Sequence, residues 1–198
     1  PVVAKTIDRN GDFLAQFIRS IPENGKVLDV GCGGGHLAAI LAGKHAGWRI
    51  TGIDLSVHQI RRAMNRCRGM DDRTVFVAGS ALSLPFNSGT FDGVTSVCSI
   101  KHWPEPARGL EECLRVLRPG GTLAVVEVDR NHGRDDERAF VARQHVPFFL
   151  KPFALAGFRW KVAARSLTAR EGISLFKDIP AAETESYEIP GMPLWMII

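Results

Sequence analysis

The chain lacks the sequence features of several protein classes. No apolar stretch approaches the roughly 18 residues that a membrane-spanning helix needs, and the first residues contain no apolar core of a signal peptide. The cysteines stand far apart without a CxxC pair, which argues against a zinc site and against a disulfide scaffold. We therefore expect a cytoplasmic protein with no metal, no membrane partner and reduced thiols at Cys32, Cys67, Cys98 and Cys113.

Excess charge of one sign is also scarce. Lys and Arg total 25 against 21 Asp and Glu, a net charge of +4. This surplus is mild, and no stacking aromatics of an RNA-binding module are found, so nucleic acid is not expected as a substrate. Arg61, Arg62, Arg66 and Arg68 share one expected helix, but their spacing spreads them around it, as on a solvated face.

The sequence has the composition of a globular protein and a pattern in which expected strands and helices alternate. The 198 residues are 45% hydrophobic, which suits a single domain over 1–198 with one core. Short β-branched runs alternate with helical patterns, which predicts an α/β fold: a Rossmann-like, doubly wound, mostly parallel sheet of about seven strands. Five strands are expected at Lys26–Gly31, Arg49–Asp54, Thr74–Gly79, Phe91–Val97 and Thr122–Val128, and an antiparallel edge hairpin at Ser186–Ile189 and Leu194–Ile198.

Helix boundaries carry recognisable signals. Ser56 opens a capping box that predicts a helix to about Gly69. Pro104 predicts the start of a second helix, which ends before the Pro119–Gly121 turn. Thr168 opens another capping box, for a helix that stops near Pro180.

One stretch, Arg130–Arg165, interrupts the alternation. It has a charged start and then an aromatic patch that includes Phe148, Phe149 and Phe153, with no strand between. It is too long for an ordinary connection and too apolar for a linker, which predicts a helical insertion after the fifth strand. Because ligands of open α/β sheets bind beyond the carboxyl ends of the strands, we expect a substrate cap. A helical pair that merely covers the sheet is an equal alternative.

A glycine loop follows the first expected strand. Gly31–Gly35 contains four glycines, and His36 then begins a helix, so a ligand can approach the backbone and the helix N-terminus closely. A dinucleotide fingerprint would need a small residue in place of His36. Asp29, two residues before the first glycine, suits a cationic ligand better than a phosphate. S-adenosylmethionine (SAM), which carries an amino group and a sulfonium, fits, and an NAD(P)-dependent oxidoreductase is the weaker alternative.

The segment VLDVGCGGG resembles motif I of class I SAM-dependent methyltransferases, in particular the small-molecule group similar to the ubiquinone and menaquinone methyltransferases. Four later segments resemble the motifs of this family in order and spacing. They are Gly52–Ser56, Gly79–Phe86, Phe91–Val94 with Ile100–Trp103, and Glu112 with Arg115–Gly121.

The resemblance implies a cofactor site. Asp54 is expected to hold the ribose hydroxyls of SAM, and Leu55 to pack on its adenine. Ser80 replaces an aspartate that in the family accepts a hydrogen bond from the adenine amino group, so we expect a weaker contact there, assisted by the backbone N–H of Ala81. Cys98 lies near the expected methionine moiety. Asp29, Gly31 and Gly33 complete the expected cofactor site.

The resemblance also implies an activity, methyl transfer from SAM to a small-molecule acceptor. His102 matches a histidine of the family and is either a general base or a loop residue that orders its neighbours. Asp92 and Glu112 are interpreted as structural. A SAM-binding protein without catalytic activity is the alternative function, and the sequence predicts neither the acceptor nor an oligomeric state.

Overall fold

The computed structural model describes residues 14–70, 72–142, 147, 150, 153, 155–157, 166–177, 184–188 and 194–198. The predicted aromatic residues Phe148 and Phe149 lie outside this range. The chain divides into two compact units, one of residues 1–125 with Ile198 and one of residues 126–197.

The first unit is an alternation of strands and helices, as predicted. Its strands follow the order β3-β2-β1-β4-β5, with β1 parallel to both β2 and β4. Its elements are α2 (Ala15–Ser20), β1 (Lys26–Val30), α3 (His36–Lys44), β2 (Arg49–Asp54), α4 (Val57–Arg66), β3 (Thr74–Ala78), β4 (Phe91–Val97), the short 3-10 helix η2 (Ile100–His102), α5 (Pro106–Val116) and most of β5 (Leu117–Val128).

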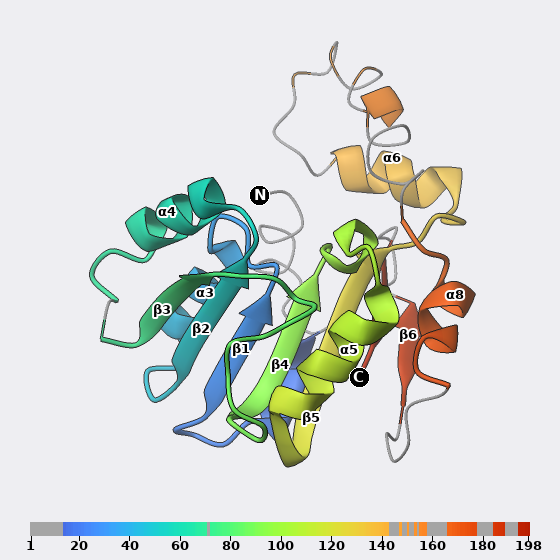
Figure 1. Cartoon of the computed structure of the whole chain (residues 1–198). Coiled ribbons are helices and arrows are strands. Elements are labelled where there is room, and N and C mark those ends of the chain that lie inside the picture. Colours follow the sequence, from blue (N-terminus) through green and yellow to red (C-terminus); the bar gives the residue numbers. More distant parts are fainter. Residues whose placement is uncertain are drawn as a thin grey trace. The chain divides into compact units, whose positions relative to one another are not determined.

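The central strand explains why the first unit is stable. All residues of β1 except Lys26 are buried, because neighbouring strands flank β1 and helices cover the sheet. In Figure 1, α3 lies behind the sheet and α5 in front of it. Leu28 in β1 has Thr51 and Val94 as its register partners. This doubly wound arrangement leaves the ends of the strands as the place for a ligand.

Local chemistry sets most boundaries, although several differ from the prediction. The side chain of Ser56 accepts a hydrogen bond from the Gln59 N–H and caps α4, but the predicted capping box is only half formed, because the Ser56 N–H donates to Asp54 Oδ1 and not to the Gln59 side chain. Helix α5 begins two residues later than predicted, because Pro106 occupies its first turn. Strand β5 begins at Leu117 and continues through the expected turn, where Gly120 has a left-handed φ of +73°.

In its described residues the second unit contains the end of β5 and four further elements, and its strand order is β5-β7-β6. The predicted antiparallel hairpin is confirmed, with Tyr187 opposite Met196. A full capping box joins Thr168 and Glu171 at α8, which ends at Ser174 rather than near Pro180. These elements are α6 (Arg134–Ala142), α8 (Ala169–Ser174), β6 (Ser186–Glu188) and β7 (Leu194–Ile197).

The described part of the chain has seven strands in all, and α6 follows β5 where a helical insertion was predicted. None of its helices combines the length and apolar character that crossing a membrane requires.

Candidate cofactor site

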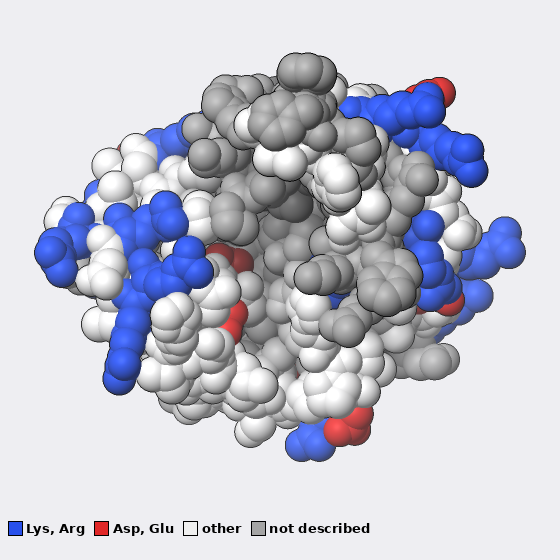
Figure 2. Space-filling model, turned by 90° about the horizontal axis from the view of Figure 1, so that it is seen from above, with Lys and Arg blue, Asp and Glu red and all other residues white. Residues whose placement is uncertain are grey.

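The predicted site residues all lie in the first unit, at or just beyond the carboxyl ends of parallel strands. Asp29 is near the end of β1, Asp54 ends β2, Ser80 follows β3 and Cys98 follows β4. The arrows of β1, β2 and β4 point upward in Figure 1, so Figure 2, which is seen from above, looks onto this edge. Open α/β sheets bind their ligands at this edge.

The glycine loop needs glycine for two different reasons. Gly31 has φ +74°, and a β-carbon there would lie only 1.8 Å from the hydroxyl oxygen of Ser99. Gly35 has φ +71°, and its β-carbon would lie 2.8 Å from that of Ala63 on α4. Gly33, with φ +52°, has open space where a side chain would be. The loop is therefore held close to its neighbours at both ends and open to a ligand in the middle.

Asp54 connects the glycine loop to the end of β2. Its Oδ2 accepts a hydrogen bond from the Gly33 N–H at 2.9 Å, and its Oδ1 accepts one from the Ser56 N–H at 2.8 Å. The N–H groups of Gly31 and Cys32 donate to the Ile53 carbonyl. A carboxylate offers about four acceptor positions, so Asp54 can hold the loop and still accept from two hydroxyl groups.

Asp29 is the most unusual group of the site. Its side chain is 2% exposed, and Oδ2 has no hydrogen-bond partner among the described residues. Burial, and then the nearby charge of Asp54, raise its pKa to about 7. The hydroxyl of Thr95, its register partner on β4, also lacks a partner. Because unsatisfied buried polar groups are costly, this pair marks a place where a polar or cationic ligand is favourable.

The segment after β3 carries the residues expected near adenine. The N–H of Gly79 donates to the Asp54 carbonyl at 3.0 Å, which fixes this segment beside β2. The Ser80 hydroxyl accepts from the Leu82 N–H at 3.1 Å. Among the described residues, the Ala81 N–H forms no hydrogen bond. Leu55 is 78% exposed, as expected of a side chain that packs on a ligand rather than in the core.

The turn after β4 is strained and well connected. Cys98 has φ +54°, a left-handed conformation that is uncommon for residues other than glycine and occurs most often at functional sites. Lys101 Nζ donates to the Cys98 carbonyl at 3.1 Å. Trp103 Nε1 donates to the Ser99 hydroxyl at 3.0 Å, the same oxygen that lies against Gly31. His102 ends η2 with its side chain exposed.

Two further features of this region concern cysteine chemistry and metal binding. Burial, and then the charges of Asp29 and Asp54, raise the pKa of the Cys32 thiol far above its ordinary value, so the thiol stays protonated and is a poor nucleophile. In the ranges that the structure describes, no three His, Cys, Asp or Glu side chains are grouped so as to hold a metal ion. The Cys32 thiol is therefore not a candidate nucleophile of this site.

Comparison with known proteins identifies the protein family to which this site belongs. Residues 28–125 match a family model described as a methyltransferase domain. Over these residues the chain is a methyltransferase domain of the class I SAM-dependent kind. The match spans the glycine loop, Asp54, Ser80, Cys98 and His102, and SAM is the methyl donor of this family.

Two relatives of this methyltransferase cover most of the chain. The 2-methyl-6-phytyl-1,4-hydroquinone methyltransferase of Synechocystis sp. is 32% identical in an alignment that covers 99% of this chain and 61% of that protein. The 24-methylenesterol C-methyltransferase 2 of Oryza sativa subsp. japonica is 34% identical in an alignment that covers 92% of this chain and 48% of that protein. The chain therefore spans between about half and about three fifths of the length of these relatives.

Solved structures agree on the fold. The [4+2]-cyclase SpnF is 34% identical, with a TM-score of 0.58 over 66% of this chain and 49% of its own. A SAM-dependent methyltransferase from Aquifex aeolicus is 17% identical, with a TM-score of 0.67 over 94% of this chain and 86% of its own. These similarities confirm the predicted Rossmann-like fold.

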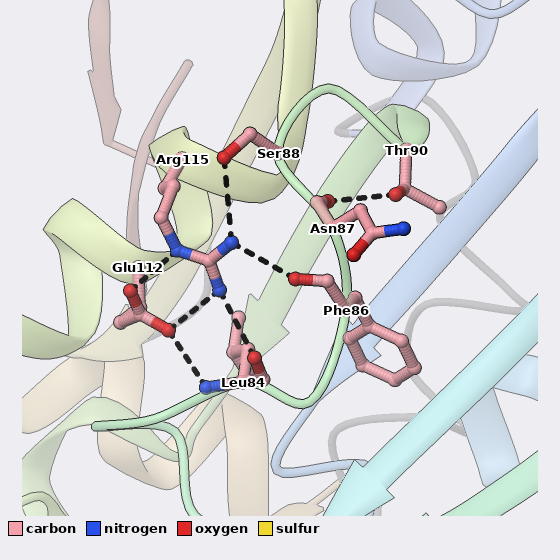
Figure 3. A network of polar contacts seen from close by, with 7 residues as sticks. All are labelled: Leu84, Phe86, Asn87, Ser88, Thr90, Glu112 and Arg115. Atoms are coloured by element: carbon pink, nitrogen blue, oxygen red, sulfur yellow. Dashed lines mark hydrogen bonds and ion pairs between the residues drawn. The ribbon is translucent and has the colours of Figure 1, made fainter.

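The methyltransferase site also contains a network that the sequence did not reveal (Figure 3). Glu112 Oε2 accepts from the Leu84 N–H at 2.7 Å, and Oε1 accepts from Arg115 Nε at 2.6 Å. The Arg115 guanidinium donates to the carbonyls of Leu84 and Phe86 at 3.0 and 2.8 Å, and to the Ser88 hydroxyl at 3.5 Å. Helix α5 thus holds the segment that begins with the adenine-side residues. No local motif indicates this contact, because Glu112 and Leu84 are 28 residues apart.

Proposed function

We propose that this chain binds SAM at the Asp29, Asp54 and glycine-loop site and transfers its methyl group to a small lipophilic acceptor. The observation that carries the proposal is the carboxyl oxygen of buried Asp29, which has no hydrogen-bond partner among the described residues and lies in the strand that leads into the glycine loop. The family match and the names of the two relatives, which act on a hydroquinone and a sterol, support it.

The residues present fit SAM by their chemistry. Asp29 offers a buried carboxyl group to a cation, and Gly33 leaves space for close approach of the ligand to the backbone. Asp54 has acceptor positions left for the two ribose hydroxyls, and Leu55 offers an exposed apolar surface to the adenine. Ser80 and the Ala81 N–H supply weaker polar contacts for the ring than the aspartate of the family.

When bound, SAM supplies an electrophilic methyl group on a sulfonium. An acceptor held in line with that methyl group would displace S-adenosylhomocysteine as the leaving group and would give up a proton. The protein's part is to hold the partners in line and to exclude water, since the reaction needs few catalytic side chains. His102, exposed on η2 beyond β4, is proposed as the group that takes the acceptor's proton.

A binding experiment tests the cofactor assignment. Thermal shift and calorimetry should show that SAM and S-adenosylhomocysteine stabilise the chain and that NAD does not, because a ligand of the native state stabilises it by mass action. Asp54→Ala should weaken SAM binding by about tenfold or more, since a charged acceptor of two hydroxyls is lost. Asp92→Ala is the matched control, because Asp92 accepts from Lys26 N–H at the opposite edge of the sheet. Equal stabilisation by NAD, or equal losses in both variants, would overturn the assignment.

A second experiment tests the acceptor class. SAM with a deuterated methyl group is incubated with the chain and either a prenylated hydroquinone or a sterol, and the products are weighed by mass spectrometry. A labelled product supports lipophilic methyl transfer. Binding of SAM without any labelled product favours the second candidate, a SAM-binding protein that does not methylate. The similarity to SpnF, a protein described as a cyclase, is the observation behind that candidate.

We also propose that Arg130–Arg165 forms a cap that supplies the acceptor pocket. In its described part, Leu150 is 43% and Phe153 is 75% exposed, so apolar side chains are available to an apolar ligand. Hydrogen exchange tests the cap. We expect less protection there than in Thr122–Val128 of the apo protein and a gain in protection when SAM and acceptor are added. Equal protection in both segments, unchanged by ligands, would make the insertion structural. The cytoplasmic location stays a prediction from the sequence.

A further inference from the structure

The positive charge of the chain is concentrated on one segment. Residues 55–70 contain four arginines and no Asp or Glu, so the rest of the chain holds 21 basic and 21 acidic residues. The whole net charge of +4 therefore corresponds to this segment, which includes α4. Figure 2 shows basic side chains gathered on the side of the molecule where α4 lies in Figure 1.

The arginines and two apolar side chains share the exposed surface of α4. The buried side of the helix is formed by Ile60 and Ala63. On its outer side Val57 is 53% and Met64 is 54% exposed, and at helical spacing they flank Arg61. We define the α4 surface as Val57, Met64 and the four arginines Arg61, Arg62, Arg66 and Arg68.

Two of the arginines have no hydrogen-bond or ion-pair partner among the residues that the structure describes. Arg66 Nε donates to the Gly34 carbonyl at 2.7 Å, and Arg68 donates to Asn65 Oδ1 at 3.2 Å. Within the described ranges, neither Arg61 nor Arg62 forms a hydrogen bond or an ion pair. Their charges are therefore available to an anionic partner outside the chain, with the two apolar side chains beside them.

We propose that the α4 surface docks on an anionic lipid membrane. A cluster of four or more arginines on a helix attracts the acidic headgroups of a membrane, and exposed apolar side chains beside them can enter the interface. Single-stranded nucleic acid would require aromatic side chains for base stacking, and this surface has none. The sequence-based prediction of no membrane partner rested on spanning segments, which peripheral docking does not need.

Docking through the α4 surface would have a functional consequence, because of where this surface lies. Helix α4 begins three residues after Asp54, and Arg66 donates a hydrogen bond to the glycine loop, so the surface adjoins the candidate cofactor site. Docking would hold that site close to the lipid phase, where a lipophilic acceptor is dissolved. This consequence rests on the proposed function, whereas the binding itself does not.

Vesicle co-sedimentation of the full chain tests the proposal without any methyl transfer. We expect binding to vesicles of phosphatidylglycerol mixed with phosphatidylcholine and little binding to phosphatidylcholine alone. Each arginine near an anionic surface contributes about 1 kcal/mol, or about fivefold in partitioning, so the double variant Arg61→Gln, Arg62→Gln should lose about 25-fold. Salt at about 1 M, where the Debye length is about 3 Å, should abolish binding.

Matched variants distinguish this surface from charge in general. Arg49→Gln with Arg108→Gln removes the same charge from exposed arginines on β2 and α5, and should lose little binding. Met64→Gln should weaken binding without changing its salt dependence. Equal binding to neutral vesicles, or equal losses in the two double variants, would overturn the proposal. Tighter binding of single-stranded RNA through Arg61 and Arg62 would also overturn it and assign the surface to nucleic acid. A failed methylation assay leaves the vesicle result standing.

Discussion

Replacing Glu112 by Gln tests whether the network of Figure 3 fixes the segment beside the cofactor site. The substitution keeps the size of the side chain and removes its charge. It weakens the bonds that Glu112 accepts from the Leu84 N–H and from Nε and Nη2 of Arg115. Arg115 keeps its bonds to the backbone, but its guanidinium loses the carboxylate that orients it.

The size of the effect follows from exposure. The side chains of Arg115 and Glu112 are 35% and 20% exposed, so solvent screens their ion pair to roughly 0.2–1 kcal/mol. The charged bond to the part-buried Leu84 N–H adds roughly 1 kcal/mol over its neutral replacement. The free energy of unfolding should fall by about 1–2 kcal/mol. At roughly 2–4 °C per kcal/mol for a chain of this size, the melting temperature should fall by roughly 2–8 °C.

The matched control is Glu105→Gln, at the start of the same helix. Among the described residues, the side chain of Glu105 forms only an exposed contact of 3.9 Å with Arg108, so this variant should melt within about 1–2 °C of the wild type. SAM affinity, measured by calorimetry, should fall several-fold in Glu112→Gln and not in Glu105→Gln, because only the first change frees the segment after β3.

The pH dependence provides an independent check. The hydrogen bond from Arg115 is the main cause that lowers the pKa of Glu112 below its usual value of 4.5. An acid whose pKa is lower in the folded state than in the unfolded state stabilises the fold. This contribution is complete above the pKa of the unfolded state and is lost as the pH falls through the pKa of the folded state. The gap in melting temperature between wild type and Glu112→Gln should therefore be constant above about pH 5 and close in stronger acid. A variant that melts with the wild type at neutral pH, or a gap that persists in acid, would refute the reasoning.

Three further predictions concern the site itself. Asp29→Asn removes a buried carboxyl whose pKa is about 7. Because the pKa of this acid is raised in the folded state, the wild type loses stability as the pH rises from 3.8 through 7. The melting temperature of the variant should therefore rise relative to that of the wild type between pH 5 and 8, and a constant difference would contradict this. Ser80→Asp should tighten SAM binding in calorimetry, because one oxygen can keep the Leu82 bond while the other meets the adenine amino group; weaker binding would mean that adenine lies elsewhere. His102→Gln should lower turnover by about tenfold or more with SAM affinity unchanged if its imidazole takes the proton, whereas wild-type turnover would leave positioning as the whole mechanism.

Sequence patterns predicted the elements whose ends are fixed by local chemistry. β2 and β4 have the expected bounds, Arg49–Asp54 and Phe91–Val97, because each is an apolar run closed by turn residues. The start of β5 was missed, since a Pro-Gly-Gly sequence favours a turn. In the structure the strand nevertheless continues through Gly120, whose left-handed φ is accommodated within the element.

In the candidate site, too, the residues recognisable from the local sequence were predicted, and the contacts that depend on packing were not. The glycines of the loop and Asp54 were found by spacing along the chain, and the structure brings them together through the bond from Gly33. The link between Glu112 and Leu84 depends on how α5 packs, which no local pattern contains. The unpartnered oxygen of Asp29 likewise depends on burial by neighbouring elements, although the residue itself was predicted.

The hydrogen bond from Trp103 to the Ser99 hydroxyl makes the Trp103 indole an intrinsic fluorescence probe of the glycine loop. It lies where a β-carbon of Gly31 would be, and it also accepts the indole N–H of Trp103 at 3.0 Å. A ligand that moves the glycine loop changes the surroundings of one hydroxyl and, through it, the hydrogen bond of one indole. Because indole emission responds to its hydrogen bonding, the difference spectrum between wild type and Trp103→Phe reports loop movement without a label.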